Sequence, residues 1–390
     1  MKKLSFIIAA AQFAFVFFSD LAVAKTIKSA PVKIVVAGAT VTESGMPAWR
    51  QGQAVGEWRQ IPNSALSNVP ISVNTYPTLG NTGPSSKVGA WCGFGIDTRD
   101  SSIYSAANGG HNDYAGNEVD RIRLSDDAPA WKEVKASTPA EQVVARQDHY
   151  ADGRPTSRHS YYGAFVNEVR DRVMIIGGSG WGAPLTHSID AFSLALNDWD
   201  SANSFPNISA DALEATAFTE DKRNGDIYNF DNYKVMRWKS SSNTWQDLNT
   251  AGTPAYGQYS ASALDTKRNR ILVVGGNAGE HSTYDISGNT MQQIVFSGPN
   301  SGVVGGDTGD GLVYDSNLDT YLFRKGGGGS TVYRINAQSF SIDTLSTTLG
   351  NTVPAADNGV WRRFLFVPKL KGVIFAPTYN GNMWFLRTAD

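Results

Sequence analysis

The stretch NGGHNDYAGNE, residues 108–118, concentrates side chains that can move protons and form hydrogen bonds. It places an imidazole directly after two glycines, in a chain that has only five histidines. The candidate residues in this stretch are His111, Asn112, Asp113, Tyr114 and Asn117. Imidazole and phenol groups serve as general acids and bases, and polar neighbours can hold a ligand. Turn formation explains the same composition, because Asn and Asp favour bends.

A second stretch, ARQDHYADGRPTSRHSYYG (145–163), adds guanidinium groups to imidazoles and phenols. Its candidates are Arg146, His149, Arg154, Arg158, His159, Tyr161 and Tyr162. β-Elimination from a uronic acid needs a cation or amide beside the carboxylate, a base for C5–H and an acid for the departing C4 oxygen. We therefore predict a catalytic group made of His111, His159, Arg158 and Tyr161 or Tyr162.

Further candidates adjoin other apolar runs and are predicted to bind substrate. They are Trp181, His187, His281, Lys325 and Arg362. Imidazoles also bind zinc, so His111, His149, His159 and His187 form an alternative metal site. Calcium stays open as a cofactor, and the sequence disfavours copper.

The elements that must position these residues follow from an internal repeat. A turn and a strand ending in glycines recur in RDRVMIIGGSGW (170–181), KRNRILVVGGNAGE (267–280) and LDTYLFRKGGGG (318–329). A fourth strand of each unit is marked by Trp58, Trp131, Trp199, Trp245, Met291 and Ile342. Four-stranded antiparallel sheets of this kind pack face to face around an axis. The pattern predicts an all-β propeller of six blades, or seven if 25–50 or 65–90 holds more strands.

The two ends of the chain are predicted to complete one blade together. The last repeat, 362–386, has three strands and lacks a fourth, whereas the strand around Trp58 lacks the first three. Pairing them closes the ring and removes the free sheet edges.

The glycine, aromatic and tryptophan pattern resembles the kelch repeat, the propeller type also found in galactose oxidase. The resemblance covers residues 54–390 and implies fold rather than function, because kelch propellers include enzymes, binding modules and scaffolds. Secreted propeller lyases that cleave ulvan are similar in general plan, with His, Tyr and Arg in the mouth.

All five histidines are expected on one face of such a propeller. Loops between second and third strands and segments between blades open on the same face, and each histidine falls in one of them. Trp58 and Trp131 are 73 residues apart and Trp131 and Trp199 are 68 apart, against 46 for Trp199 and Trp245. Long loops in compact domains are usually functional, so the surplus is expected to build walls around His111 and His159.

The first residues of the chain and its composition indicate where the protein is located and which partners it can have. Residues 1–24 have a basic start, an apolar stretch and an Ala-Val-Ala finish, which predicts a signal peptide, followed by an extension over 25–53 and the propeller over 54–390. We expect a periplasmic or secreted protein without membrane insertion after cleavage, since no later stretch approaches about 20 apolar residues. A net charge of −2 argues against a nucleic-acid partner, and the one cysteine, Cys92, excludes an intrachain disulfide.

The function predicted from these observations is a polysaccharide lyase that acts on an acidic polysaccharide or oligosaccharide. One alternative is a glycan- or protein-binding propeller without catalysis. A second is a sugar mutarotase. A third is a copper radical oxidase built on Cys92, Tyr161 or Tyr162 and Trp181, which the lack of a later Tyr-His pair disfavours.

Overall fold

A computed structural model describes most of the propeller region. The described residues are 43–71, 80–209, 214–231, 233–250, 252, 257–276, 279–306, 309–326, 330–348 and 353–390. The predicted signal peptide and residues 25–42 of the predicted extension lie outside them. In the described part of the chain, no helix combines the length and the apolar character needed to cross a bilayer.

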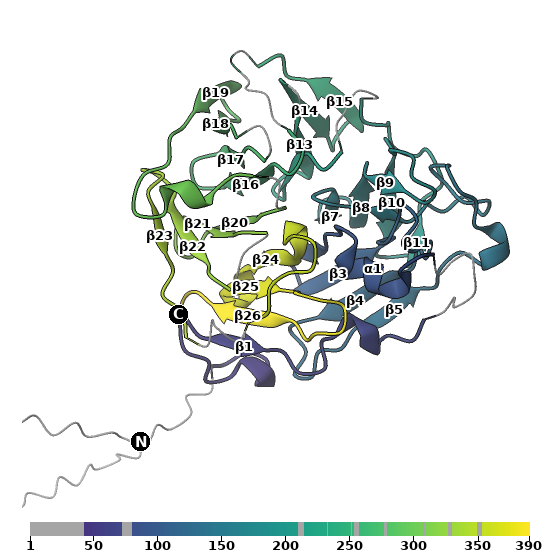
Figure 1. The fold of residues 1–390 in the computed structure, drawn as a ribbon, viewed down its shortest axis with the longest axis horizontal. Helices are drawn as coiled ribbons and strands as arrows, with labels where there is room; N and C mark the ends of the chain where they lie inside the picture. The colour runs from purple at the N-terminus through teal and green to yellow at the C-terminus, as the bar shows by residue number, and fades with distance from the viewer. Residues whose placement is uncertain are drawn as a thin grey trace, which may run out of the picture. The chain divides into compact units, whose positions relative to one another are not determined.

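Six four-stranded antiparallel sheets surround a common axis (Figure 1). Blade A contains β2 (Gly95–Asp97), β3 (Ser102–Ala106), β4 (Val119–Arg123) and β5 (Lys132–Lys135). Blade B contains β7 (Ala164–Asn167), β8 (Arg172–Ile176), β10 (Ile189–Ser193) and β11 (Asp198–Trp199). Blade C contains β12 (Ala217–Asp221), β13 (Asp226–Asp231), β14 (Lys234–Lys239) and β15 (Thr244–Asp247). Blade D contains β16 (Ala261–Asp265), β17 (Arg270–Val274), β18 (His281–Asp285) and β19 (Thr290–Gln293). Blade E contains β20 (Gly311–Asp315), β21 (Thr320–Arg324), β22 (Tyr333–Asn336) and β23 (Ile342–Thr344).

The sixth blade, F, joins the two ends of the propeller. It contains β24 (Phe364–Val367), β25 (Gly372–Phe375), β26 (Trp384–Arg387) and β1 (Trp58–Gln60). Trp58 pairs with Leu386 and Gln60 with Trp384, so the early strand supplies the outer edge of the last blade. The predicted fold and ring closure are confirmed, with six blades in the described residues rather than seven.

Burial falls from the axis outward, which explains the residue pattern of the strands. Every residue of the inner strands β12 and β16 is buried, including the acidic residues at their ends, such as Glu220 and Asp265. The outer strands β15 and β19 are mostly exposed and keep one central apolar anchor each, Trp245 and Met291. Aromatic rings fill the space between blades, as where Phe165 meets Phe218 with ring centroids 6.3 Å apart.

The turns between strands use residues that tolerate a left-handed backbone. Asp171, Asn269 and Asp319 have φ of 57°, 53° and 53° in first turns, and Asn197 and Asn243 have φ of 51° and 54° in third turns. Asp and Asn adopt this conformation more readily than other non-glycine residues. These turns mark the face that we call the lower face.

The opposite, upper face carries the segments between blades and the loops from second to third strands. The added strands here are β6 (Arg158–His159) and β9 (Ser179–Gly180), which pair with each other beside blade B. Short helices complete the connections: η1 (Ala48–Arg50), η2 (Leu66–Asn68), η3 (Gly83–Ser85), α1 (Ser86–Gly89), η4 (Ala140–Gln142), η5 (Ser301–Val303), η7 (Trp361–Arg363) and η8 (Pro368–Leu370). The two long segments predicted to flank blade A therefore hold η2, η3 and α1 on one side and η4 and β6 on the other.

Candidate functional site

A backbone position with positive φ precedes the first strand of every blade on the upper face. The residues with positive φ are Trp91 (53°), Tyr161 (46°), Ala215 (58°), Tyr259 (70°), Gly309 (63°) and Trp361 (50°). Bulky side chains rarely adopt this conformation, and such strain concentrates at functional sites. Hydrogen bonds between neighbouring positions hold it, because the Tyr161 N–H donates to the Trp91 carbonyl at 2.9 Å.

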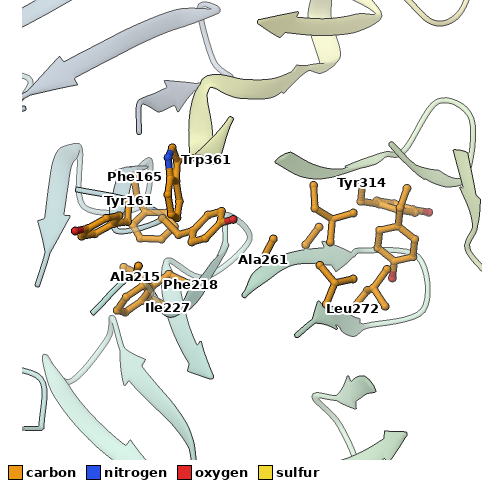
Figure 2. Close-up of a cluster of buried hydrophobic side chains, with 14 of the residues drawn as sticks. Tyr161, Phe165, Ala215, Phe218, Ile227, Ala261, Leu272, Tyr314 and Trp361 are labelled. Carbon is orange, nitrogen blue, oxygen red and sulfur yellow. The ribbon is translucent and has the colours of Figure 1, made fainter. Parts of the chain in front are cut away.

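The large rings at these positions pack together near the axis (Figure 2). The Trp361 ring lies with its centroid 5.2 Å from that of Tyr161 and 5.6 Å from that of Tyr259. Tyr162 approaches the same indole at 5.0 Å. Figure 2 shows Tyr161 and Trp361 gathered with Phe165, so residues of blades B and F meet here. This packing fixes the Tyr161 ring in one place.

Asp113, His159, Tyr161 and Glu214 form one chain of polar contacts across the upper face. Asp113 Oδ2 lies 3.0 Å from His159 Nε2, and Asp113 Oδ1 accepts a hydrogen bond from the Thr82 hydroxyl at 2.9 Å. On the other side of the imidazole, Nδ1 lies 3.4 Å from the Tyr161 hydroxyl, which donates to Glu214 Oε1 at 2.5 Å. A carboxylate stands at each end, with an imidazole and a phenol between them. General acid–base catalysis uses groups of these types within such reach.

The surroundings set the protonation of this chain. The hydrogen bond with His159 holds the pKa of Asp113 below its usual value, and it outweighs the opposing effect of burial. Burial, reinforced by the nearby Glu214 carboxylate, raises the pKa of Tyr161. At neutral pH Asp113 is therefore an anion and Tyr161 keeps its proton.

His111 and Trp91 border this chain. The His111 ring lies with its centroid 5.5 Å from that of His159, and the Trp91 ring lies 5.0 Å from it on a tilted plane. His159 is buried, whereas His111 is exposed and stands on a backbone with φ of 48°. The structure thus brings His111, His159 and Tyr161 together, as the sequence predicts, and leaves His111 facing solvent.

The two long segments adjoin the site as expected. The Asn81 N–H donates to the Asn112 carbonyl at 2.8 Å, and the Thr82 N–H donates to the Asp113 carbonyl at 3.1 Å. A groove of about 450 Å³ lies along this wall and is lined by Thr82, Trp91, Asp113, Asp357 and Asn358 among others. A ligand in the groove would contact Asp113 and one Trp91 surface.

Arg158 is placed differently from its predicted catalytic role. Its guanidinium is wholly buried, lies 2.9 Å from Asp190 Oδ2 and donates to the Ser188 hydroxyl at 3.2 Å. His149 contacts the other oxygen of the same carboxylate at 2.7 Å. Arg158 therefore compensates a buried charge between β6 and blade B, and His149 belongs to that cluster rather than to the His111 site.

Three further candidates have structural positions. Tyr114 is buried and donates to Glu118 Oε1 at 2.9 Å. Asn117 is buried and donates to the Pro155 carbonyl at 2.8 Å. Tyr162 donates to the Asp310 carbonyl at 2.8 Å, away from the His159 chain. These contacts stabilise blade A and the centre of the propeller. Of the two adjacent tyrosines, only Tyr161 has its hydroxyl near His159.

The rim of the site holds Asn112 and Arg146. Both are exposed. The Arg146 N–H donates to the Trp181 carbonyl at 2.8 Å, and the next residue, Gly182, donates to the His111 carbonyl at 2.5 Å. Arg146 is thus one backbone contact away from the His111 loop.

Trp181 and Arg154 take other roles. Trp181 packs in a small cluster with Ala115 and Tyr150. The Arg154 guanidinium is held by Asp152 at 3.1 Å and by the Ala136 carbonyl at 2.8 Å.

The remaining candidates lie apart from the chain. His187 lines a small pocket behind Tyr161 and Tyr162. His281 stacks near Phe296 with ring centroids 4.9 Å apart, in blade D, and burial lowers its pKa. Lys325 donates to the Val303 carbonyl at 3.2 Å. Arg362 lines a cavity on the axis. Four of the histidines lie in upper-face segments, and His281 is the first residue of strand β18 rather than a loop residue. Only His111 and His159 have rings in contact with each other.

The predicted metal site depends on four histidines, and these do not all come together in one place. Among the residues that the structure describes, no group of three or more His, Cys, Asp or Glu side chains is placed to hold a metal ion. Cys92, considered for a copper oxidase, is buried and donates to the Ala90 carbonyl at 3.1 Å. Burial raises the pKa of this thiol to about 12.

Sequence reasoning missed Glu214, Trp91 and Thr82. Glu214 lies just ahead of β12 and directly precedes Ala215, the residue that has the positive φ of Tyr161, so the repeat gives no signal for Glu214 itself. Trp91 occupies the position of Tyr161 ahead of β2, so aligning the segments between blades could have found it. No sequence signal points to Thr82, which reaches Asp113 through the fold of a long segment.

No protein-family model matches the chain, and a comparison with curated proteins gives no significant match. Among solved structures, a structural genomics protein of unknown function from Bacteroides thetaiotaomicron VPI-5482 is similar, with a TM-score of 0.48 and 11% identity. The match covers 84% of this chain and 74% of that one. It assigns no chemistry to either protein.

Proposed function

We propose that this protein is a secreted or periplasmic kelch-type propeller that acts as a polysaccharide lyase on a uronic-acid-containing glycan. The observation that supports the proposal is the continuous chain from Asp113 through His159 and Tyr161 to Glu214, next to the exposed His111. It supplies a base and an acid within contact of each other, which β-elimination requires.

Each member of the chain has a role in the proposed reaction. Asp113 accepts the Nε2 proton of His159 in a hydrogen bond and so leaves the Nδ1 lone pair available. Nδ1 removes the proton at C5 of the uronate while Tyr161 protonates the departing C4 oxygen. The C5–H and C4–O bonds break and a C4–C5 double bond forms. The new imidazolium proton then passes to the Tyr161 oxygen, 3.4 Å away, which restores both groups.

Glu214 and the rim residues assist this transfer. Glu214 orients the phenol between turnovers, since its Oε1 accepts the hydrogen bond that the Tyr161 hydroxyl donates. His111 and the Asn112 amide are exposed beside the chain and can contact the substrate carboxylate, which makes C5–H more acidic. Arg146 extends this polar rim. Trp91 offers a surface on which a sugar ring can stack.

The test is incubation of the purified protein with glucuronan, ulvan, alginate and pectate. The lyase forms a conjugated unsaturated uronate at each new chain end, which absorbs in the ultraviolet. We expect absorbance to rise with at least one polymer and mass spectrometry to show products lighter than hydrolysis products by one water. Folded protein that yields neither signal on all four polymers contradicts the proposal.

The Tyr161–Glu214 contact supports a second candidate, a glycoside hydrolase. A carboxylate 2.5 Å from a phenol can accept its proton while the phenol oxygen attacks the anomeric carbon, which makes Tyr161 the nucleophile, with Asp113 as the second carboxyl group of the site. Its products are saturated reducing ends that gain one water and no ultraviolet absorbance. Glycan binding without any product would instead indicate a binding propeller.

A further inference from the structure

A second cavity opens along the propeller axis on the lower face, below the aromatic rings. Its volume is about 270 Å³. Inner strands of several blades line it, and Tyr162 and Trp361 lie among its lining residues. The turn residues Thr266 and Ser316, which follow the inner strands β16 and β20, also line the cavity and place its mouth on the lower face. Its size approaches that of small-molecule sites, which start near 300 Å³.

A buried carboxylate in this cavity has only one cationic side chain of the described part of the chain paired with it, and that cation is shared with other groups. Glu220, in β12, lines the cavity and is 9% exposed, and neither of its oxygens accepts a hydrogen bond from the described residues. Lys222 Nζ forms an ion pair with Oε2 at 3.2 Å, but its three protons have closer acceptors. These acceptors are the Ile96 and Val166 carbonyls and Glu168 Oε1, each at 2.9 Å. Burial accordingly raises the pKa of Glu220.

A guanidinium in the same cavity has one nitrogen without an acceptor. Arg362, in η7, stacks its guanidinium on the Phe165 ring with 4.2 Å between the guanidinium carbon and the centroid. Its Nε is buried and donates to no described residue. Burial lowers the pKa of Arg362 to about 10, so it remains charged at neutral pH.

Buried polar atoms without a hydrogen-bond partner are costly even where opposite charges lie nearby, and a ligand that bonds to both side chains removes the cost. The matching ligand carries an ammonium for Glu220 and a carboxylate for Arg362, because charge-assisted hydrogen bonds are the strongest available to these groups. Leu312 and Phe364 add apolar wall between strands. A neutral sugar would meet both groups with weaker hydrogen bonds.

We propose that the axial cavity binds a free α-amino acid through Glu220 and Arg362. The site is separate from the His159 chain and does not depend on the lyase assignment. Trp361 borders both the cavity and Tyr161, so it is the wall between the two sites.

Isothermal titration calorimetry on the full chain tests this site. The probes are a panel of apolar and polar α-amino acids, the amide and N-acetyl derivatives of the best binder, and glucose. We expect one or more amino acids to bind and to raise the melting temperature. The amide lacks the carboxylate and the N-acetyl derivative lacks the ammonium, so each should bind at least about tenfold more weakly, since each loses one charged pair.

Variants then locate the site. Glu220→Gln and Arg362→Met should each weaken binding by about tenfold or more, whereas the matched surface change Glu141→Gln should leave it unaltered. The derivatives report on the unmodified protein even if a cavity variant fails to fold. No binding across the panel, glucose binding better than every amino acid, or derivatives binding as well as the parent amino acid would overturn the assignment.

Discussion

At the scale of single residues, the partner that a side chain has in the fold decides whether that side chain can take part in catalysis. Arg158 and His159 are neighbours in sequence. The Arg158 guanidinium forms an ion pair with Asp190, whereas the His159 imidazole lies between Asp113 and Tyr161. The sequence shows residue types but not partners. It could therefore indicate His111, His159 and Tyr161 as candidates and could not separate them from Arg158, Tyr114 or Asn117.

Replacement of Asp113 by Asn should lower stability in a pH-dependent way. The folded pKa of Asp113 lies below its ordinary value of 3.8, so the charged form stabilises the folded state. This contribution is fully present above 3.8 and is lost as pH falls through the folded pKa. We expect the variant to melt below the wild type at neutral pH and the difference to shrink in strong acid. A difference that stays constant over the whole range would show that the carboxylate charge has no part in it.

At the scale of elements, glycines let the His111 loop approach the β6–β9 pair. Gly110 has φ of 65°, and a Cβ there would lie 2.4 Å from the Arg158 Cα and from the Ser179 carbonyl oxygen. Gly153 has φ of 83°, and a Cβ there would have no neighbour within 4 Å. Both glycines have a left-handed backbone, but only Gly110 has other atoms close to the place that a Cβ would occupy.

Alanine substitution at these glycines should separate the two effects. Gly153→Ala should cost only the left-handed penalty, about 1–2 kcal/mol. Gly110→Ala should cost clearly more, because the backbone of two strands must move, and it should displace His111. Urea unfolding measures both losses. Equal losses would mean that the loop is not tightly packed on β6 and β9.

The repeat is the part of the fold that local sequence can predict. Trp58, Trp199, Trp245, Met291 and Ile342 lie in outer strands as expected, since an exposed strand with one apolar anchor leaves a local pattern. Trp131 falls one residue ahead of β5. Glu214 was missed because its partner, Tyr161, comes from the preceding blade, and no local pattern records contacts between blades.

At the scale of the whole propeller, the strand that closes the ring should matter more than an equivalent strand elsewhere. Trp58 is completely buried in a cluster that includes Leu322, Phe364 and Leu386. Trp58→Ala should cost about 3–5 kcal/mol, the usual range for a buried aromatic residue. Trp245→Ala, at the same place in blade C, should cost less, because Trp245 is only partly buried. Denaturant unfolding of the two variants compares them, and a smaller loss for Trp58 would argue against closure by β1.

The adjacent tyrosines offer the most direct test of the proposed active site. Both are buried, but the Tyr161 hydroxyl joins the chain between His159 and Glu214, whereas the Tyr162 hydroxyl donates to a carbonyl on the axis. The measurement is the initial rate of product formation by the wild type, Tyr161→Phe and Tyr162→Phe on the polymer that the wild type cleaves. We expect Tyr161→Phe to lose about 10²–10⁴-fold in kcat and Tyr162→Phe to keep its rate while losing about 1 kcal/mol of stability. Equal activity in the two variants would contradict the assignment of the Asp113–His159–Tyr161–Glu214 chain as the catalytic centre.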